Sequence, residues 1–337
     1  HFLQGLCMKK IFLGAFIASM YMPIALADTC EKPKLSGREG YDTVYCLNEE
    51  GLSMVTKPGN EKIPFLYGFV NQQGKVIVPL KYYVARDFSE GLAAVCKIVG
   101  KSDQILCGYI NASGKEVIPL KFQDLPGDFE QGIAPVKQKG RWGFIDKNGK
   151  VVIPFQYVKA DSFSEGLAAV VTADTNKYGY INTKGEMVIP PKYEEAFYFN
   201  EGVAAVQILD KWGYIDKRNQ WVIPARYKSA SNFEDGMARV SQSDKYGYID
   251  KKGKVVIPFK YEYLGSLSEG LIGAELNGKF GYLDKTGKVV IPFKFGTFND
   301  FQNGVALVNM KNMFKDEDFS EDEFFYIDKQ GMPVEVE

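Results

Sequence analysis

The stretch WGFIDKNGKVVIPFQY, residues 142–157, contains the kinds of side chain from which a small active site is made. It carries an indole (Trp142), a carboxylate (Asp146), two lysines and a turn with a glycine (Gly149). Close copies begin at Tyr246 and Phe280. The stretch is therefore either a site that was duplicated or the material from which the fold is built.

The lack of histidine beyond His1 restricts the chemistry that is possible for this chain. A chain without that residue has no histidine general base, no Ser-His-Asp or Cys-His nucleophile and no His-ligated zinc. No Walker loop, dinucleotide fingerprint or metal-spaced cluster is present, so we expect no cofactor and no metal. A glycosidase that uses two carboxylates stays open as an alternative. Most acidic residues nevertheless recur from copy to copy, which favours a shared turn role: Glu90, Glu165, Glu201 and Glu269.

The first residues have the pattern of an export signal. From Met8 the chain has two lysines, an apolar run and the Ala-Leu-Ala sequence that ends at Ala27, which is typical of a secretory signal peptide. We therefore expect residues 1–27 to be removed, with a mature protein that begins at Asp28, has no membrane anchor and is periplasmic or secreted by a bacterium. The net charge of -1 gives no electrostatic reason to expect a nucleic-acid partner.

Four cysteines remain after that cleavage, and an even number in an exported chain favours disulfides. Cys96 and Cys107 flank a short segment between two strand-like runs, and Cys30 and Cys46 lie together near the N-terminus. We favour the pairs 30–46 and 96–107, although spacing alone does not fix the connectivity.

Internal periodicity explains most of the sequence. A glycine after an aromatic or similar residue recurs, with the last three steps 34 residues long: Gly68, Gly108, Gly143, Gly179, Gly213, Gly247 and Gly281. A degraded eighth copy, FFYIDKQGMPVEV, lies near the C-terminus. Each unit has three runs rich in Val, Ile and Tyr, bounded by Gly and Asx, which is the pattern of short strands.

The turn between the first two runs indicates a structural role for Asp146. This position is Asp or Asn in all eight copies, and three residues later Gly149 has Gly or Asn as its counterparts. That spacing predicts a type I turn closed by a left-handed residue, with the Asx side chain bonded to the turn backbone. Pro154, five residues further on, is expected to end its strand or to mark a sheet edge.

The repeated unit resembles the bacterial WG-repeat family, which is also described by a Lys-Trp-Gly motif. The resemblance rests on units such as KWGYIDKRNQWVIPARY followed by F-x-E-G-(L/M/V)-A-x-V. Only Trp142 and Trp212 keep the Trp of the motif, the latter before Gly213. The resemblance implies an all-β tandem array used for binding or sensing, and it supplies no catalytic residues.

Positions that differ between copies are where a site could have been added to the array. Trp221 occupies a position filled elsewhere by Val, Glu or Met, and Arg239 replaces a small residue. Both are candidate ligand contacts, although an exposed aromatic and a solvated arginine are the plainer interpretations. Residues 315–325 are rich in acids but lack the spacing of a calcium loop.

The sequence thus predicts an all-β array of about seven three-stranded meanders plus a partial eighth, with an open superhelix favoured over a closed ring. Residues 28–65 are expected to form an N-terminal cap, and residues 66–337 the repeat domain. The expected function is a non-enzymatic periplasmic or cell-surface module that binds a protein, peptide or envelope glycan. The sequence does not determine the oligomeric state.

Overall fold

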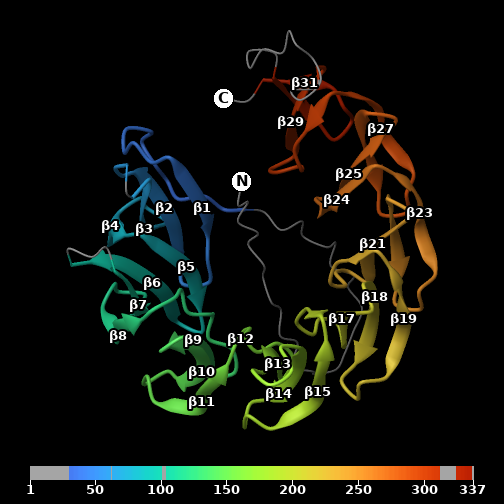
Figure 1. The fold of residues 1–337 in the computed structure, drawn as a ribbon. Coiled ribbons are helices and arrows are strands. Elements are labelled where there is room, and N and C mark those ends of the chain that lie inside the picture. Colours follow the sequence, from blue (N-terminus) through green and yellow to red (C-terminus); the bar gives the residue numbers. More distant parts are fainter. Residues whose placement is uncertain (1–29, 62, 101–103, 312–323, 336–337) are drawn as a thin grey trace, which may run out of the picture.

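The protein is an array of antiparallel β-sheets (Figure 1). The computed structural model describes residues 30–61, 63–100, 104–311 and 324–335. The signal peptide predicted at residues 8–27 and most of the acidic segment 315–325 lie outside the described residues. In the described part of the chain there are eight sheets, which we call A to H in chain order. These residues include no helix long and apolar enough to cross a membrane.

Each sheet is a meander of consecutive strands. The strands of sheets A to D are β1 (Thr43–Leu47), β2 (Leu52–Pro58), β3 (Phe65–Asn71), β4 (Val76–Tyr82); β5 (Val84–Ser89), β6 (Leu92–Val99), β7 (Gln104–Asn111), β8 (Glu116–Phe122); β9 (Ile133–Gln138), β10 (Arg141–Asp146), β11 (Val151–Tyr157); β12 (Lys159–Ala160), β13 (Leu167–Val171), β14 (Tyr178–Asn182) and β15 (Met187–Tyr193). Those of sheets E to H are β16 (Glu195–Ala196), β17 (Val203–Ile208), β18 (Lys211–Asp216), β19 (Trp221–Tyr227); β20 (Ser229–Ala230), β21 (Met237–Gln242), β22 (Lys245–Asp250), β23 (Val255–Tyr261); β24 (Tyr263–Ser268), β25 (Leu271–Leu276), β26 (Lys279–Asp284), β27 (Val289–Phe295); β28 (Thr297–Phe298), β29 (Val305–Asn309), β30 (Phe325–Asp328) and β31 (Pro333–Val334).

The prediction of three strands per unit was too low, because seven of the eight sheets have four strands. The missed strand is the first of each sheet, and in four sheets it has only two residues, as in β12. So short a strand has no alternating pattern, and it forms only because the next strand supplies its hydrogen-bond partners. Sheet C, with strands β9 to β11, keeps the expected three.

The sequence repeat and the sheet are out of phase. A sequence unit consists of the last two strands of one sheet followed by the strands that open the next sheet. For example, β10 and β11 close sheet C, and β12 and β13, later in the same unit, open sheet D. Each unit therefore ties two sheets together covalently. This offset explains why the partial eighth copy, β30 and β31, completes sheet H.

Neighbouring sheets bury apolar side chains between them, so that one core follows another along the array. Seven clusters of buried apolar residues lie between the eight sheets, one at each successive interface. Among the described residues, no strand pairing and no such cluster joins sheet H to sheet A. Figure 1 shows the sheets following one another around an arc with a gap between the two ends, the first strands toward the centre and the fourth strands outside.

The outer hairpin of each sheet has the turn that its sequence predicts. The Oδ1 atom of Asp146 accepts hydrogen bonds from the N–H groups of Asn148 and Lys150, both at 2.9 Å, and Gly149 has φ 78°. All eight copies repeat these two side-chain bonds. Asp146 is therefore a turn residue.

Pro154 does not end its strand, which continues to Tyr157. Between Phe144 and Trp142 the pairing partner on β11 moves from Ile153 to Tyr157, so the outer strand bulges opposite Gly143. A Cβ atom on Gly143 would lie 2.7 Å from the Ile153 carbonyl oxygen, which requires glycine there. Proline is tolerated because this is an edge strand, the second of the two predicted explanations.

The N-terminal segment contributes both strands and a cover. Within the predicted cap 28–65, β1 and β2 are the first two strands of sheet A. At inner interfaces the turn glycine packs on a β-branched residue of the preceding sheet, as Gly149 does on Ile118. Sheet A is the first sheet of the described residues, and a Cβ on Gly74 would instead contact Lys34 and Leu35.

The structure contains both favoured disulfides. Cys30–Cys46 joins the covering segment to β1, with Cα atoms 5.2 Å apart. Cys96–Cys107 links opposite residues of β6 and β7, with Cα atoms 4.0 Å apart.

Candidate functional site

The inner turn between the first two strands of a sheet, which we call the tip, is a tight two-residue hairpin. In sheet D, Ser164 and Leu167 exchange backbone hydrogen bonds around Glu165 and Gly166. Both central residues have positive φ, 51° and 88°, as a type I′ turn requires. Glutamate is an unusual residue in that conformation, so its side chain needs a compensating role.

Contacts to the next sheet supply that role. The carboxylate of Glu165 accepts a hydrogen bond from the N–H of Gly202 and pairs with Nζ of Lys217 at 3.1 Å. Lys217 also donates to the Glu165 carbonyl at 2.8 Å, and Oγ of Ser164 donates to the Phe199 carbonyl at 2.7 Å. These contacts join one tip to the next tip and to the next outer hairpin.

The same set of contacts recurs along the array, and we call it the tip ladder. Glutamates with both a Gly N–H and a Lys partner are Glu90, Glu165, Glu201 and Glu269. Donors to the carbonyl of the next tip are Ser89, Ser164, Asn200 and Ser268. Each ion pair is partly exposed and contributes only about 0–1 kcal/mol, so the ladder serves alignment more than stability. The shared turn role predicted for these glutamates is what the structure shows.

The ladder is interrupted between sheets F and G. Glu234 stands where Ser or Asn donates in sheets B, D, E and G, as Glu130 does in sheet C. An ionised carboxylate cannot donate to the Leu267 carbonyl. Asp235 replaces the ladder glutamate and is one methylene shorter. Within the described residues it has no hydrogen bond to the N–H of Gly270 and no ion pair with Lys285, the counterparts of its partners elsewhere.

The interface between sheets C and D is also altered, but in a different way. Gln131 and Thr183 replace the glutamate and the lysine together, so both charges are absent. Among the interfaces of the described residues, only F–G keeps both charged groups without joining them.

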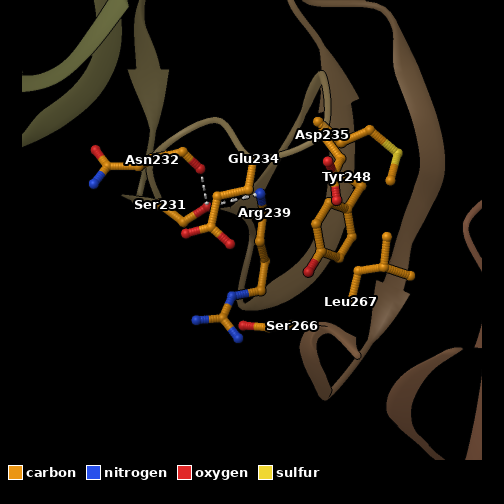
Figure 2. Close-up of a pocket in the computed structure, with 9 residues that line it drawn as sticks. Ser231, Asn232, Glu234, Asp235, Arg239, Tyr248, Ser266 and Leu267 are labelled. Atoms are coloured by element: carbon orange, nitrogen blue, oxygen red, sulfur yellow. Dashed lines mark hydrogen bonds between the residues drawn. The ribbon is translucent and has the colours of Figure 1, made fainter. Parts of the chain in front are cut away.

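A pocket lies at that interruption (Figure 2). Its walls come from the tip of sheet F, from β21 and β22, and from β24: Ser231, Asn232, Glu234, Asp235, Met237, Arg239, Tyr248, Ser266 and Leu267. Figure 2 shows Glu234 and Arg239 extending to the same side, with Tyr248 and Leu267 across from them. The cavity volume is ≈ 70 Å³, well under the roughly 300–1,000 Å³ of typical small-molecule sites. The pocket therefore suits one functional group of a ligand.

Arg239 is held through both its backbone and its side chain. Its own N–H donates to Oγ of Ser231 at 3.0 Å, and Nη1 donates to the Leu264 carbonyl. Tyr248, the residue paired with Arg239 across the sheet, donates to the carbonyl of Gly265 at 2.6 Å. The equivalents of Arg239 include Ala169 and Gly273, so the long side chain is specific to this sheet.

Glu234 and Asp235 are exposed at the tip, and partial desolvation is the largest influence on the pKa of Glu234 and of the nearby Asp300. Desolvation raises the pKa of Glu234, and the nearby Asp235 raises it further, whereas Arg239 lowers it. Desolvation also raises the pKa of Asp300, which Arg239 opposes. Burial raises the pKa of Tyr248 to about 12, so its hydroxyl stays protonated. The pocket thus combines the Arg239 guanidinium with the carboxylates of Glu234 and Asp235, which have no ion pair within the described part of the chain.

The two candidate binding residues are not brought together. Trp221 lies on β19, the outer strand of sheet E, with its ring at 84° to that of Tyr193, whereas Arg239 lies on β21 of sheet F. Trp212 stacks on Phe197 with ring centroids 5.0 Å apart, and Trp142 is half-buried against the C–D core. Glu234 and Asp235 were not singled out from the sequence, although comparison of the eight tips marks both as departures.

The repeat can now be compared with known proteins. The family described as "WG containing repeat" matches residues 67–97, 108–142, 142–174, 178–212, 212–246, 246–280 and 280–314. The chain belongs to the WG-repeat family. The seven matches begin at the next-to-last strand of a sheet, in phase with the sequence unit. Curated proteins gave no match.

Solved structures show likeness in fold alone. A structure titled "Crystal structure of the eukaryotic initiation factor" superposes with a TM-score of 0.61 at 12% identity, covering 90% of this chain and 89% of that one. Dihydro-heme d1 dehydrogenase NirN gives a TM-score of 0.49 at 11% identity, with 86% and 74% covered. The extracellular domain of the putative one component system BT4673 from B. thetaiotaomicron gives 0.39 at 10%, with 91% and 58% covered. Identities this low transfer no activity to the WG-repeat chain.

Proposed function

We propose that this WG-repeat protein is a non-enzymatic binding module that holds a protein, peptide or envelope-glycan partner at the F–G pocket. The observation that carries the proposal is the interruption of the tip ladder. The tip of sheet F has Glu234 and Asp235 in place of the Ser or Asn and the Glu that form the ladder at the tips of sheets B, D, E and G, and the same interface gains Arg239. A repeat-fixed framework with a locally altered interface is how a binding site is added to an array.

The position of the pocket suits a macromolecular partner. The tips face the centre of the arc in Figure 1, so β24 and its neighbours lie on the inner side. We propose that the array stays open as a superhelix, which leaves this inner side accessible to an extended chain. A small pocket within a long concave surface would anchor one group while the surrounding tips contact the rest.

An exported location fits the same proposal. The two disulfides are of the kind that persists in oxidising compartments such as the periplasm. We therefore propose that the partner is a component of the periplasm or the cell surface.

The alternative, a glycosidase, has one observation in its favour, since Glu234 and Asp235 are two carboxylates in one pocket. A glycosidase holds its carboxyl groups on either side of the scissile bond. Glu234 and Asp235 are consecutive residues of one turn, and the cavity is small beside a typical ligand site. Binding without hydrolysis is the better-supported function. Release of reducing sugar from envelope glycan, abolished by Glu234→Gln, would reverse this preference.

The test is affinity capture from an envelope extract with mature protein, followed by mass spectrometry. Arg239→Ala should reduce capture of the specific partner at least tenfold. The matched control is Arg218→Ala, which removes an exposed arginine from the outer hairpin of sheet E, away from the pocket. Equal capture by wild type and Arg239→Ala would remove the pocket from the proposal, and no specific capture by wild type would remove the binding function itself.

A further inference from the structure

Some polar groups at the F–G interface lack the partners that their counterparts have in the tip ladder, and these groups indicate what the F–G pocket binds. At a complete interface, such as D–E, the tip carboxylate meets a lysine ammonium and a glycine N–H, and the next tip carbonyl receives a hydroxyl donor. At F–G the corresponding acceptors are the carboxylates of Glu234 and Asp235 and the carbonyl of Leu267. Among the described residues none of these three receives an ammonium or a hydroxyl.

Hydrogen-bond donors at the F–G interface also lack the partners of their counterparts. The N–H of Gly270 lacks the carboxylate that its counterpart Gly202 receives, and within the described residues the hydroxyl of Ser266 has no hydrogen bond. Arg239 uses one nitrogen for the Leu264 carbonyl and keeps its other N–H groups. A complementary ligand therefore carries a strong N–H donor for the carboxylates and an oxygen acceptor close to it.

Charge and size limit the ligand further. Two carboxylates and one guanidinium give the pocket a net charge of about -1 when all are ionised, which matches a single positive charge. The cavity volume of ≈ 70 Å³ equals about two water molecules at roughly 30 Å³ each. That space admits an ammonium with its adjoining methylene and excludes a guanidinium on its own long chain or a sugar ring.

We propose, resting on the binding function above, that the pocket takes a primary ammonium group of a peptide partner, a lysine side chain or a free amino terminus. The ammonium binds at Glu234 and Asp235 and makes the ion pair that Lys285 does not make there within the described residues. A peptide carbonyl next to it accepts from Arg239 or from the N–H of Gly270. The ligand thereby completes the tip ladder at the one interface where the chain keeps the charges apart.

The sharpest variant restores the ladder instead of destroying the site. Glu234→Ser together with Asp235→Glu gives the F tip the residues of the D tip, Ser164 and Glu165. The serine can donate to the Leu267 carbonyl, and the longer carboxylate can reach Gly270 and Lys285. This closed-tip variant should lose ligand binding without any loss of thermal stability, which separates loss of the site from failure to fold.

The matched control makes the opposite exchange at the D–E interface. Ser164→Glu with Glu165→Asp opens that tip, lowers the stability of the array and leaves the F–G pocket intact. It should bind the ligand as wild type does. Together the two variants place the same chemical changes at the proposed site and away from it.

The experiment is a titration of mature protein with the peptide acetyl-Gly-Lys-Gly-amide, followed by calorimetry or NMR. Saturable binding is expected, weakened at least tenfold when the lysine is Nε-acetylated and at least tenfold in the closed-tip variant. Equal affinity for the acetylated peptide, or unchanged affinity of the closed-tip variant, overturns the proposal. Binding of glucosamine but not of the peptide overturns the peptide assignment. If the peptides fail while the closed-tip variant loses capture of the envelope partner, the ligand class is wrong and the proposed function stands.

Discussion

A buried tyrosine on the third strand fixes the spacing between neighbouring sheets, and its hydroxyl can be removed without changing the packing. Tyr109 donates to the carbonyl of Gly127, in the connection to sheet C, at 2.8 Å. Tyr180, Tyr214, Tyr248 and Tyr282 make the equivalent bond to a carbonyl 17 residues further on. Sheet C has Phe144 at this position, so the chain itself provides an interface without the bond.

The magnitude follows from how well water can replace the lost donor. A hydrogen bond of this kind contributes about 1 kcal/mol net, and an acceptor left buried costs a further ~1–2 kcal/mol. Gly127 is buried, so Tyr109→Phe should destabilise the B–C interface by about 2–3 kcal/mol. Ser231, the acceptor for Tyr214, is only half-buried, and Tyr214→Phe should cost about 1 kcal/mol. The reverse change, Phe144→Tyr, supplies a donor and should be neutral or stabilising.

Hydrogen exchange measured by mass spectrometry tests these values interface by interface, as suits an array whose neighbours unfold semi-independently. Because 1.4 kcal/mol corresponds to a factor of ten, exchange in the connection before β9 should accelerate roughly thirtyfold or more in Tyr109→Phe. Tyr214→Phe should accelerate exchange about fivefold at its own interface. Equal effects of the two substitutions, or none, would falsify the view that burial of the acceptor sets the cost.

Two further predictions concern the disulfide in sheet B and an acid in sheet D, Asp161, whose pKa is raised. Replacing Cys96 and Cys107 by alanine removes a crosslink across 11 residues, which should lower the free energy of unfolding by about 2–3 kcal/mol. Urea unfolding should show the same loss for the reduced wild type. No loss would mean that the bond leaves the unfolded chain unconstrained. Desolvation raises the pKa of Asp161 above its ordinary value, with Lys159 lowering it and Glu195 raising it. A raised pKa means that the folded state favours the protonated acid, so stability is lost as the pH rises from the unfolded pKa of ~3.9 through the folded pKa. Asp161→Asn should therefore raise the melting temperature at pH 7 and not below pH 3, and a gain that does not change with pH would assign the effect to packing.

The phase offset between repeat and sheet has a consequence for engineering. Removal of one sequence unit deletes the outer half of one sheet and the inner half of the next. The remaining halves pair to restore a complete sheet, because the units have their strands in the same order and only the unit that leads into sheet C lacks a first strand. Splitting the chain between sheets instead leaves a unit incomplete, and each end then needs a cover such as the segment around Leu35.

The F–G pocket shows how far sequence comparison reaches. Arg239 was recognised as a departure because a charge among alanines is conspicuous. Alignment of the tips also shows that Glu234 and Asp235 differ from the residues at most tips. These turns are usually acidic, however, so the effect of the change cannot be inferred until the contacts of both side chains are known. Those partners, Gly270 and the Leu267 carbonyl, lie on another sheet.

Local physics explains what the sequence by itself determined. The Asx and Gly positions, the strands that follow them and the all-β class depend on backbone conformations that a few neighbouring residues set. Tertiary structure decided the rest: the short first strands, the phase of the sheets, the cover over sheet A and the tip ladder. Each of these joins groups far apart in the chain, as Glu165 and Lys217 are, 52 residues apart. The same holds for Asp235. That it makes no bond to Gly270 and no ion pair with Lys285 within the described residues follows from how sheets F and G are stacked.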